Sequence, residues 1–313
     1  MKTKLIVILG QTASGKTALS IKLAKKFNGE IISADSRQVY KGMDIGSGKI
    51  TPDTKNSPNF STGQAKKKYI FTHQGIPHYC IDVASPKNKF SVAQYQKIAL
   101  EATDKIQKKE KTPFLVGGTG FYIQVVVDGI SIPKVKPDWK LRKNLEKQSA
   151  EELFEKLEKI DPRRAKNIDR HNKRRLIRAL EIAEKIGTVP PLSLPCPRFD
   201  VLLLGIKKSQ EELKKLISKR LIKRLKGGEM INEVRKLRKS GLSWKRLEEF
   251  GLEYRYIAQY LQKKIRYQEM IEKIQRESEK FAKRQITWFK KDKRIKWISK
   301  TEEARDLIKE FLK

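Results

Sequence analysis

The stretch GQTASGKTALS at residues 10–20 decides the fold that we expect for this chain. It fits the pattern G-x-x-x-x-G-K-[ST]. In this pattern the backbone N–H groups of the loop point at a phosphate, the lysine neutralises the phosphate, and the hydroxyl binds Mg²⁺. The residues predicted to bind a diphosphate or nucleotide are therefore Gly10, Gln11, Thr12, Ala13, Ser14, Gly15, Lys16 and Thr17.

The segments around this loop indicate an α/β fold. Leu19, Leu23 and Phe27 recur every four residues before Asn28-Gly29, which is typical of a helix with a glycine stop. Apolar runs predict strands, and helices are expected between them: the strands are 5–9, 30–34 and 113–117, and the helices are 16–27 and about 91–109. Such alternation predicts a P-loop NTPase-like parallel sheet flanked by helices, with ligands at the carboxyl ends of the strands.

From about residue 134 the pattern changes to charged helices. Those expected are 138–148, 150–159 and 172–186, and a proline-rich stretch at 189–198 precedes another core strand, FDVLLLGI at 199–206. Further helices are expected at 209–226, 229–239, 254–262, 268–291 and 301–312, whereas residues 50–76 are polar and predict a loop. We therefore predict an α/β core of residues 1–129 and 198–313, interrupted by an all-α insertion domain of residues 130–197 that contacts RNA.

The chain is strongly basic. It has 71 Lys and Arg against 36 Asp and Glu, which gives a formal net charge of +35. This excess favours a polyanionic partner such as nucleic acid, and a merely solvated lysine-rich surface is the alternative. No apolar run is long enough for a membrane span, so no membrane partner is expected. Cys80 and Cys196 lack a C-x-x-C partner, which argues against a disulfide framework or a zinc site and indicates the reducing cytoplasm.

Two turns at the predicted strand ends carry polar side chains. Asp35 follows the strand IISA, where it could be a Mg²⁺ ligand, direct or through water, or a general base. The residues alone leave both roles open. Thr119 lies in GGTGFY at 117–122, where the glycines permit close approach of a ligand.

The helix that begins after Ser209 places two arginines on its apolar side. Ser209 and Glu212 form a capping box, which sets the phase of the helix and directs Arg220 and Arg224 into its apolar arc. An inward arginine needs an anionic partner, since its unpaired burial is costly. We favour a substrate phosphate for Arg220; the alternative is an arginine that reaches solvent from the edge of the arc.

Two basic clusters favour contacts with the phosphates of a nucleic acid. They lie in RHNKRRLIRALEI at 170–182 and FAKRQITWFKK at 281–291, and their predicted contacts are Arg174, Arg175, Arg178, Lys283 and Arg284. Phe281 and Trp288 are seven residues apart, and we interpret them as part of a core stripe rather than as a base-stacking platform.

Six motifs in this chain resemble those of the tRNA dimethylallyltransferases, also called tRNA isopentenyltransferases. In chain order they are GQTASGKT, ISADSRQVYKGMDIGSGK, PHYCIDV, LVGGTGFYI, RRLIRALEI and AKRQITWF. The second motif is specific, because nucleotide kinases do not carry it. The resemblance implies transfer of a dimethylallyl group from dimethylallyl diphosphate to N6 of the adenine on the 3′ side of the anticodon. It also implies a bacterial-type enzyme, since the zinc-finger extension of eukaryotic relatives is absent.

The resemblance also implies roles for individual residues. Asp35 would be the base for the N6 proton, and Lys16 and Thr17 would hold the diphosphate and Mg²⁺, with Asp35 as a second candidate ligand of the metal. Arg220 would stabilise the departing pyrophosphate, so the catalytic set is Asp35, Thr17 and Arg220. The implied tRNA contacts are Asp35, Ser36, Arg37, Gln38, Thr119 and Arg142. The expected partners are dimethylallyl diphosphate and the anticodon stem-loop of tRNA, and a monomer is expected.

The chain departs from the usual family pattern at several places. Gln11 replaces a usual proline, PHYCID replaces PHHLID, GLEYRYI at 251–257 replaces a GLGY-like turn, and the loop at 53–76 is longer. A small-molecule kinase, a prenyltransferase of free nucleotides and a non-catalytic RNA-binding P-loop protein are the alternatives. The second motif and the net charge of +35 argue against the kinase, and the basic helices at 170–182 and 281–291 would have no role in a prenyltransferase of free nucleotides.

Overall fold

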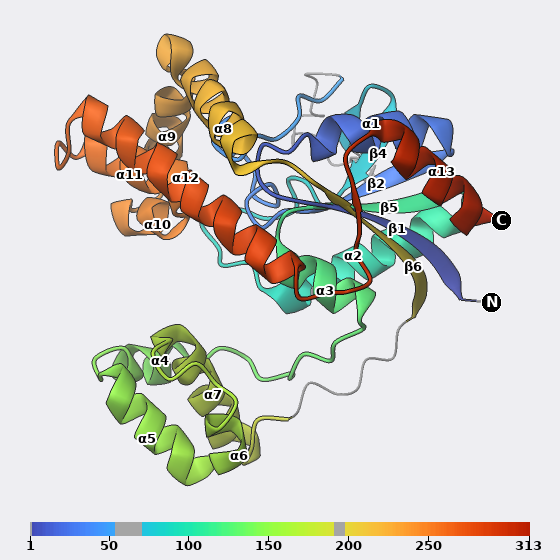
Figure 1. Ribbon diagram of the computed structural model, residues 1–313. Coiled ribbons are helices and arrows are strands. Elements are labelled where there is room, and N and C mark those ends of the chain that lie inside the picture. Colours follow the sequence, from blue (N-terminus) through green and yellow to red (C-terminus); the bar gives the residue numbers. More distant parts are fainter. Residues whose placement is uncertain (1, 54–70, 191–197) are drawn as a thin grey trace, which may run out of the picture. The chain divides into compact units, whose positions relative to one another are not determined.

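The computed structural model describes residues 2–53, 71–190 and 198–313. The chain forms two compact units (Figure 1). The core unit comprises Met1–Asp128 and Pro197–Lys313, and the insertion unit comprises Gly129–Cys196. Two predicted segments lie largely outside the described residues: the proline-rich stretch at 189–198, of which 191–197 are not described, and the loop at 50–76, of which 54–70 are not described.

A seven-stranded sheet forms the centre of the core unit, with the order β3-β4-β2-β5-β1-β6-β7. Its strands are β1 Thr3–Leu9, β2 Gly29–Ala34, β3 Phe71–His73, β4 Ile76–Tyr79, β5 Thr112–Gly117, β6 Phe199–Ile206 and β7 Lys296–Ile298. All neighbouring strands are parallel except β3 and β4, which form an antiparallel pair. The predicted loop at 50–76 is therefore wrong at its end, because β3 begins at Phe71.

The register of the sheet brings three predicted turns to one edge. Gly117 at the end of β5 pairs with both Leu9 of β1 and Ala34 of β2. The phosphate loop, Asp35 and the turn that contains Thr119 consequently begin side by side at the carboxyl edge. A Cβ atom on Gly117 would lie 2.2 Å from the carbonyl oxygen of Ala34, so only glycine permits this close approach.

Helices cover both faces of the sheet in the core unit (Figure 1). On one face, α1 (Lys16–Lys26) and α13 (Thr301–Leu312) bury apolar side chains against Ile6 and Ile8 of β1. On the other face lie α2 (Val92–Gln107) and α3 (Gly120–Val127), where the rings of Tyr95 and Tyr122 stack at 3.8 Å between centroids. Burial on both faces explains why the central strands are continuously apolar.

A second group of helices lies beyond the carboxyl edge of the strands (Figure 1). It consists of α8 Gln210–Leu225, the short 3-10 helix η1 Lys226–Gly228, α9 Glu229–Lys239, α10 Trp244–Glu249, α11 Leu252–Leu261 and α12 Tyr267–Phe289. The apolar arc predicted for α8 is buried at Leu213, Ile217, Leu221 and Leu225. These helices supply the walls of the candidate site.

The insertion unit is entirely helical in its described residues. It contains α4 Trp139–Leu145, α5 Ala150–Ile160, α6 Pro162–Ala165 and α7 Lys173–Ile186. Its small core includes Leu153 and Leu157 of α5 and Leu176 and Leu180 of α7, all at most 1 % exposed. The sequence patterns predicted α4, α5 and α7 and missed the four-residue α6.

Candidate active site

The phosphate loop joins β1 to α1 and has the backbone that its motif requires. Ala13 and Gly15 adopt positive φ angles of 62° and 93°, so the loop curls before α1 begins at Lys16. The hydroxyl oxygen of Ser14 is buried and has no hydrogen-bond partner among the described residues. Such an orphaned polar atom, at the N-terminus of a helix with a lysine in its first turn, fits an anion that binds there.

Helix α12 fixes this loop to the turn after β5. Gln285 accepts a hydrogen bond from the backbone N–H of Thr12 at 2.7 Å and donates one to the carbonyl oxygen of Gly118 at 2.8 Å. Gln11 donates to the carbonyl oxygen of Ala282 on the same helix at 3.1 Å. Gln285 is 6 % exposed. Sequence reasoning missed this residue, although it lies inside the motif AKRQITWF and on the buried face of α12 between Ala282 and Phe289.

Asp35 is held by one carboxylate oxygen in the turn after β2. Its Oδ1 accepts hydrogen bonds from the backbone N–H groups of Arg37 at 2.8 Å and Gln38 at 3.3 Å. Across the described ranges, Oδ2 accepts none. The neighbouring Ser36 N–H donates to the hydroxyl of Thr119 at 3.1 Å, which ties this turn to the one after β5. The carboxylate therefore has a fixed orientation and one oxygen available to a ligand.

A cavity of about 250 Å³ opens over these turns and is closed by helices α8, α11 and α12. The predicted site residues that line it are Thr12, Asp35, Ser36, Arg37, Thr119, Arg220 and Arg284. Lys283, the neighbour of Arg284, instead lines a separate cavity of about 630 Å³. Thr17 has an exposed side chain on the first turn of α1 and is not part of the lining.

Gln38, which is predicted to contact the target nucleotide, does not line this cavity. Its side-chain oxygen accepts a hydrogen bond from the hydroxyl of Ser33 at 3.0 Å, and its amide nitrogen donates to the carbonyl oxygen of Gly48 at 3.4 Å. The side chain therefore supports the loop that follows Asp35.

Two arginines of α8 enter the cavity with different partners. Arg224 contacts the carboxylate of Glu253 at 3.3 Å and donates to the carbonyl oxygen of Gly46 at 3.2 Å. Arg220 donates to the hydroxyl of Thr12 at 2.6 Å, and it forms no ion pair with an acidic side chain of the described chain. Its charge is therefore met by a neutral hydroxyl, as expected for a cation whose anionic partner is a ligand.

The pKa values of Arg220 and Lys16 also favour an anion that binds beside them. The pKa of Arg220 is lowered to about 10, chiefly by burial and also by the nearby Arg224, against the opposing effect of Glu253 and Asp35. Burial also lowers the pKa of Lys16 to about 8, and Arg220 contributes in the same direction while Asp35 opposes both. Lys16 donates to the carbonyl oxygen of Gln11 at 2.6 Å. A bound anion would relieve the unfavourable burial of both charges.

The interpretation of Phe281 and Trp288 as a core stripe is wrong. Phe281 lines the cavity beside Arg284, and Trp288 is 38 % exposed at the C-terminal end of α12. The indole of Trp288 lies close to Gly120, where an added Cβ atom would be 2.4 Å from the ring. The seven-residue spacing places both side chains near one face of the helix, but the neighbouring elements leave this face partly open.

The arginines of the insertion unit that are predicted to contact RNA are of two kinds: two are paired with a buried acid, and two are exposed. Arg142 binds the fully buried carboxylate of Glu181 with two hydrogen bonds of 2.8 and 2.7 Å, and Arg178 contacts the same carboxylate. Burial raises the pKa of Glu181, but the hydrogen bonds from Arg142 and Arg178 outweigh this effect and lower the pKa overall. Arg142 and Arg178 therefore compensate a buried acid, whereas Arg174 and Arg175 are exposed on α7.

The described residues offer few side chains that could bind a metal ion. They contain no group of three or more His, Cys, Asp or Glu side chains that could hold a metal ion. The Thr17 hydroxyl and the open oxygen of Asp35 fit Mg²⁺, which takes few protein ligands and uses substrate phosphate oxygens and water for the rest. In the same described ranges, no helix is long and apolar enough to cross a membrane.

Comparison with known proteins gives a consistent result over nearly the whole chain. A family model described as IPP transferase matches residues 38–292, and one described as isopentenyl transferase matches residues 3–58. The chain is 40% identical to tRNA dimethylallyltransferase 1 of Syntrophus aciditrophicus, over 95% of this chain and 94% of that protein. It is 39% identical to the tRNA dimethylallyltransferase of Carboxydothermus hydrogenoformans, over 99% and 96%.

Solved structures resemble the chain as well. The tRNA isopentenylpyrophosphate transferase of Bacillus halodurans aligns with a TM-score of 0.70 and 33% identity, covering 99% of this chain and 97% of that one. A eukaryotic dimethylallyltransferase acting on tRNA aligns with a TM-score of 0.74 and 27% identity, covering 91% of this chain and 69% of that one.

Proposed function

The chain belongs to the tRNA dimethylallyltransferase family, and from this premise we propose the reaction that its cavity performs. It transfers a dimethylallyl group from dimethylallyl diphosphate to N6 of the adenine on the 3′ side of the anticodon in tRNA, and it releases pyrophosphate. The observation that carries this proposal is the pair of part-buried cations Lys16 and Arg220 beside the carboxylate of Asp35. Among the described residues, Lys16 donates to a carbonyl oxygen and Arg220 to a hydroxyl, and neither donates to an acidic side chain.

The proposed step breaks the allylic C–O bond and forms a bond between this carbon and N6. The diphosphate leaves with the bonding electrons, so negative charge builds up where Lys16 and Arg220 stabilise it. Asp35 accepts the N6 proton at its open Oδ2, because Oδ1 is already occupied by two backbone N–H groups. Thr17 would hold Mg²⁺, which supplies further positive charge to the diphosphate when bound.

The nucleotide side of the cavity is assigned to tRNA. The target adenine must leave the stack of the anticodon loop to reach Asp35, as enzymes that modify bases require. Ser36, Arg37, Thr119 and Arg284 line this side and are proposed to contact the nucleotide or its phosphates. Arg174 and Arg175, with Lys283, are proposed as additional phosphate contacts. A monomer in the cytoplasm, where tRNA is the available substrate, completes the proposal.

A single incubation tests this function against its alternatives. The purified protein is mixed with Mg²⁺ and radiolabelled dimethylallyl diphosphate in the presence of unmodified tRNA or of AMP, and a parallel reaction contains γ-labelled ATP. Label that enters tRNA alone supports the proposal. Label that enters AMP alone indicates a free-nucleotide prenyltransferase, and phosphoryl transfer from ATP indicates a kinase.

A further inference from the structure

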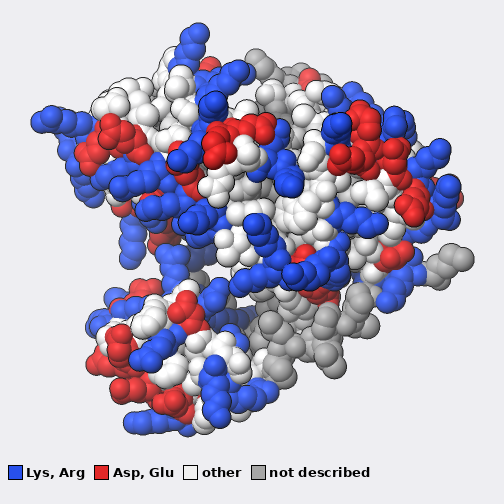
Figure 2. Space-filling model, in the orientation of Figure 1, with Lys and Arg blue, Asp and Glu red and all other residues white. Residues whose placement is uncertain are grey.

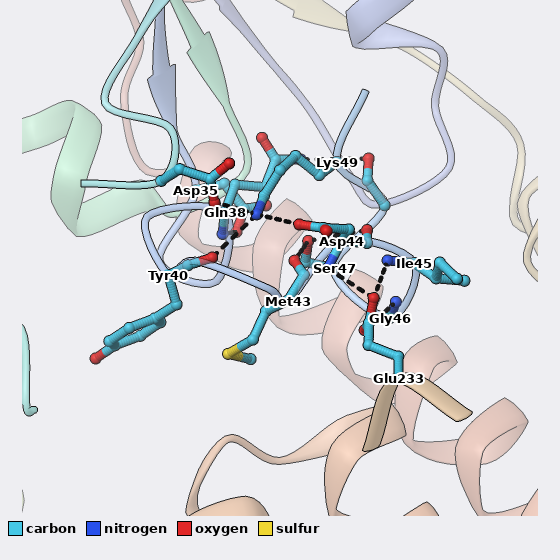
Figure 3. A network of polar contacts seen from close by, with 12 residues as sticks. Asp35, Gln38, Tyr40, Met43, Asp44, Ile45, Gly46, Ser47, Lys49 and Glu233 are labelled. Carbon is cyan, nitrogen blue, oxygen red and sulfur yellow. Dashed lines mark hydrogen bonds and ion pairs between the residues drawn. The ribbon is translucent and has the colours of Figure 1, made fainter. Parts of the chain in front are cut away.

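The loop at residues 44–49, which belongs to the second motif, is held by a buried carboxylate from a distant helix. Glu233 of α9 is 8 % exposed. Its Oε2 accepts hydrogen bonds from the backbone N–H groups of Asp44 at 2.8 Å and Ile45 at 2.6 Å, and its Oε1 accepts one from Gly46 at 3.1 Å (Figure 3). The hydroxyl of Tyr254 donates to the same Oε1 at 2.8 Å. One side chain thus satisfies three consecutive backbone donors.

A lysine closes the loop from its other end. The side chain of Lys49 is 2 % exposed, and its Nζ lies 2.5 Å from the carboxylate of Asp44 (Figure 3). The carboxylate of Asp82 lies at the same distance. The Nζ also donates to the carbonyl oxygen of Tyr40 at 3.0 Å, and the backbone N–H of Lys49 donates to the carbonyl oxygen of Asp44 at 2.9 Å. Side-chain contacts therefore hold the loop at both of its ends.

This loop sets the position of an arginine in the proposed active site. The carbonyl oxygen of Gly46 accepts the hydrogen bond from Arg224, and Gly46 and Ser47 line the cavity. Gly48 has a φ of +68°, and a Cβ atom at this position would lie 1.9 Å from the guanidinium of Arg224. The guanidinium therefore occupies space that the loop leaves open for it, next to Arg220.

We propose that Glu233 is a positioning residue for the reaction, which rests on the function proposed above. By holding the amides of residues 44–46, it fixes the wall on which Arg224 rests and keeps the nucleotide side of the cavity in its productive shape. A carboxylate suits this role because both of its oxygens accept hydrogen bonds, whereas a glutamine would direct its NH₂ group at one set of backbone donors. Glu233→Gln leaves buried N–H groups without acceptors and loosens the loop.

The test compares Glu233→Gln with Glu229→Gln, which is the same chemical change on an exposed residue of the same helix. Hydrogen exchange of the amides at 44–46 is measured without any substrate. We expect faster exchange at these amides in Glu233→Gln and no change in Glu229→Gln. Unchanged exchange in Glu233→Gln would overturn the proposal even if the enzyme were shown to act on another substrate.

Steady-state kinetics distinguish a positioning role from a purely structural one, because only a positioning role changes the constants for one substrate and not for the other. In Glu233→Gln, kcat/KM for tRNA should fall by about tenfold to a hundredfold, because small misplacements of a site cost this much. The KM for dimethylallyl diphosphate should stay within about twofold, since the hydrogen bonds of Glu233 go to the backbone of residues 44–46 and to Tyr254, and none goes to the phosphate loop. An equal loss on both substrates, together with a matching fall in Tm, would mean that Glu233 only stabilises the fold.

A second variant keeps the proposal testable if Glu233→Gln does not fold. Gly48→Ala leaves Glu233 and its three amide contacts in place but intrudes on the guanidinium of Arg224. We expect the same kinetic split, with exchange at 44–46 unchanged. Wild-type kinetics in Gly48→Ala would show that the loop does not position Arg224.

Discussion

Two arginines one turn apart on α8 should respond to the same substitution with opposite changes in stability. Arg220→Met removes a part-buried charge whose hydrogen bond, within the described part of the chain, goes to the hydroxyl of Thr12. Arg224→Met removes the partner of Glu253, which is itself 8 % exposed and would be left as an unpaired buried acid. Methionine is flexible and of similar length, so it fills either position with little strain.

The size of each effect follows from the structure. Burial lowers the pKa of Arg220 to about 10, and at about 1.4 kcal/mol per pKa unit the folded chain disfavours this charge by about 3 kcal/mol. The lowered pKa of a cation means that this penalty is fully present at pH 7. Loss of the Thr12 hydrogen bond offsets about half of the gain, so Arg220→Met should be more stable by about 1–2 kcal/mol. Arg224→Met should lose about 3 kcal/mol.

Arg220→Met should lower the activity although it raises the stability. Loss of one donor aimed at developing negative charge costs about 10²–10³ in kcat. Mg²⁺ and pyrophosphate at about 100 times the dissociation constant should raise the stability of the wild type by about 2.7 kcal/mol, and Arg220→Met should lose most of this gain. The assay is thermal unfolding of both variants with and without the ligand, followed by single-turnover kinetics. A lower Tm for Arg220→Met with an undiminished ligand effect would refute the assignment of Arg220 to the diphosphate.

Three further predictions address the remaining groups. Asp35→Asn should reduce turnover by about 10²–10⁴ while tRNA affinity in filter binding is retained, and recovery of activity at high Mg²⁺ would identify Asp35 as a metal ligand instead of the base. The double variant Arg174→Glu with Arg175→Glu should weaken tRNA binding, and the slope of log affinity against log salt should fall by about 1–2, while Tm stays unchanged. Unchanged affinity would show that these arginines only face solvent. Because burial lowers the pKa of Lys16 to about 8, its cationic form is lost as the pH rises through that value, so kcat/KM for the diphosphate should decline above about pH 8. A flat profile to higher pH would mean that Lys16 does not bind the diphosphate as a cation.

The central strands and the phosphate loop could be predicted because their signals are local. Four strands of the sheet are continuous apolar runs that a parallel, doubly covered sheet requires. By contrast β3, β4 and β7 have three, four and three residues and contain polar side chains, so no period of two can be recognised in them. The inward direction of Arg220 was predictable because the N-cap at Ser209, whose hydroxyl accepts from the backbone N–H of Glu212, fixes the helix phase.

The polar residues that organise the site could not be predicted from local patterns. Gln285 and Glu233 are buried through hydrogen bonds to backbone groups that are 167–273 and 187–189 residues away in the chain. Both residues lie on the buried side of their helices, Glu233 next to Val234 in α9 and Gln285 between Ala282 and Phe289 in α12, but helical phase does not identify the distant backbone groups that they meet. The same limit explains the error at Trp288, because helical spacing identifies a shared face and does not identify what covers it.

The second motif differs from the motifs of kinases in the loop that it forms more than in the groups that react. The phosphate loop and one acidic residue at the next strand end would serve a kinase equally well. What the second motif adds is a loop that Glu233 and Lys49 anchor and that leaves room for Arg224 at Gly48. A γ-phosphate acceptor has no need of this wall, whereas a base that enters beside Asp35 needs a fixed surface on that side. On the proposed function, we therefore expect the loop at 44–49 to contribute to the choice of an RNA base as acceptor and the phosphate loop to bind the leaving group.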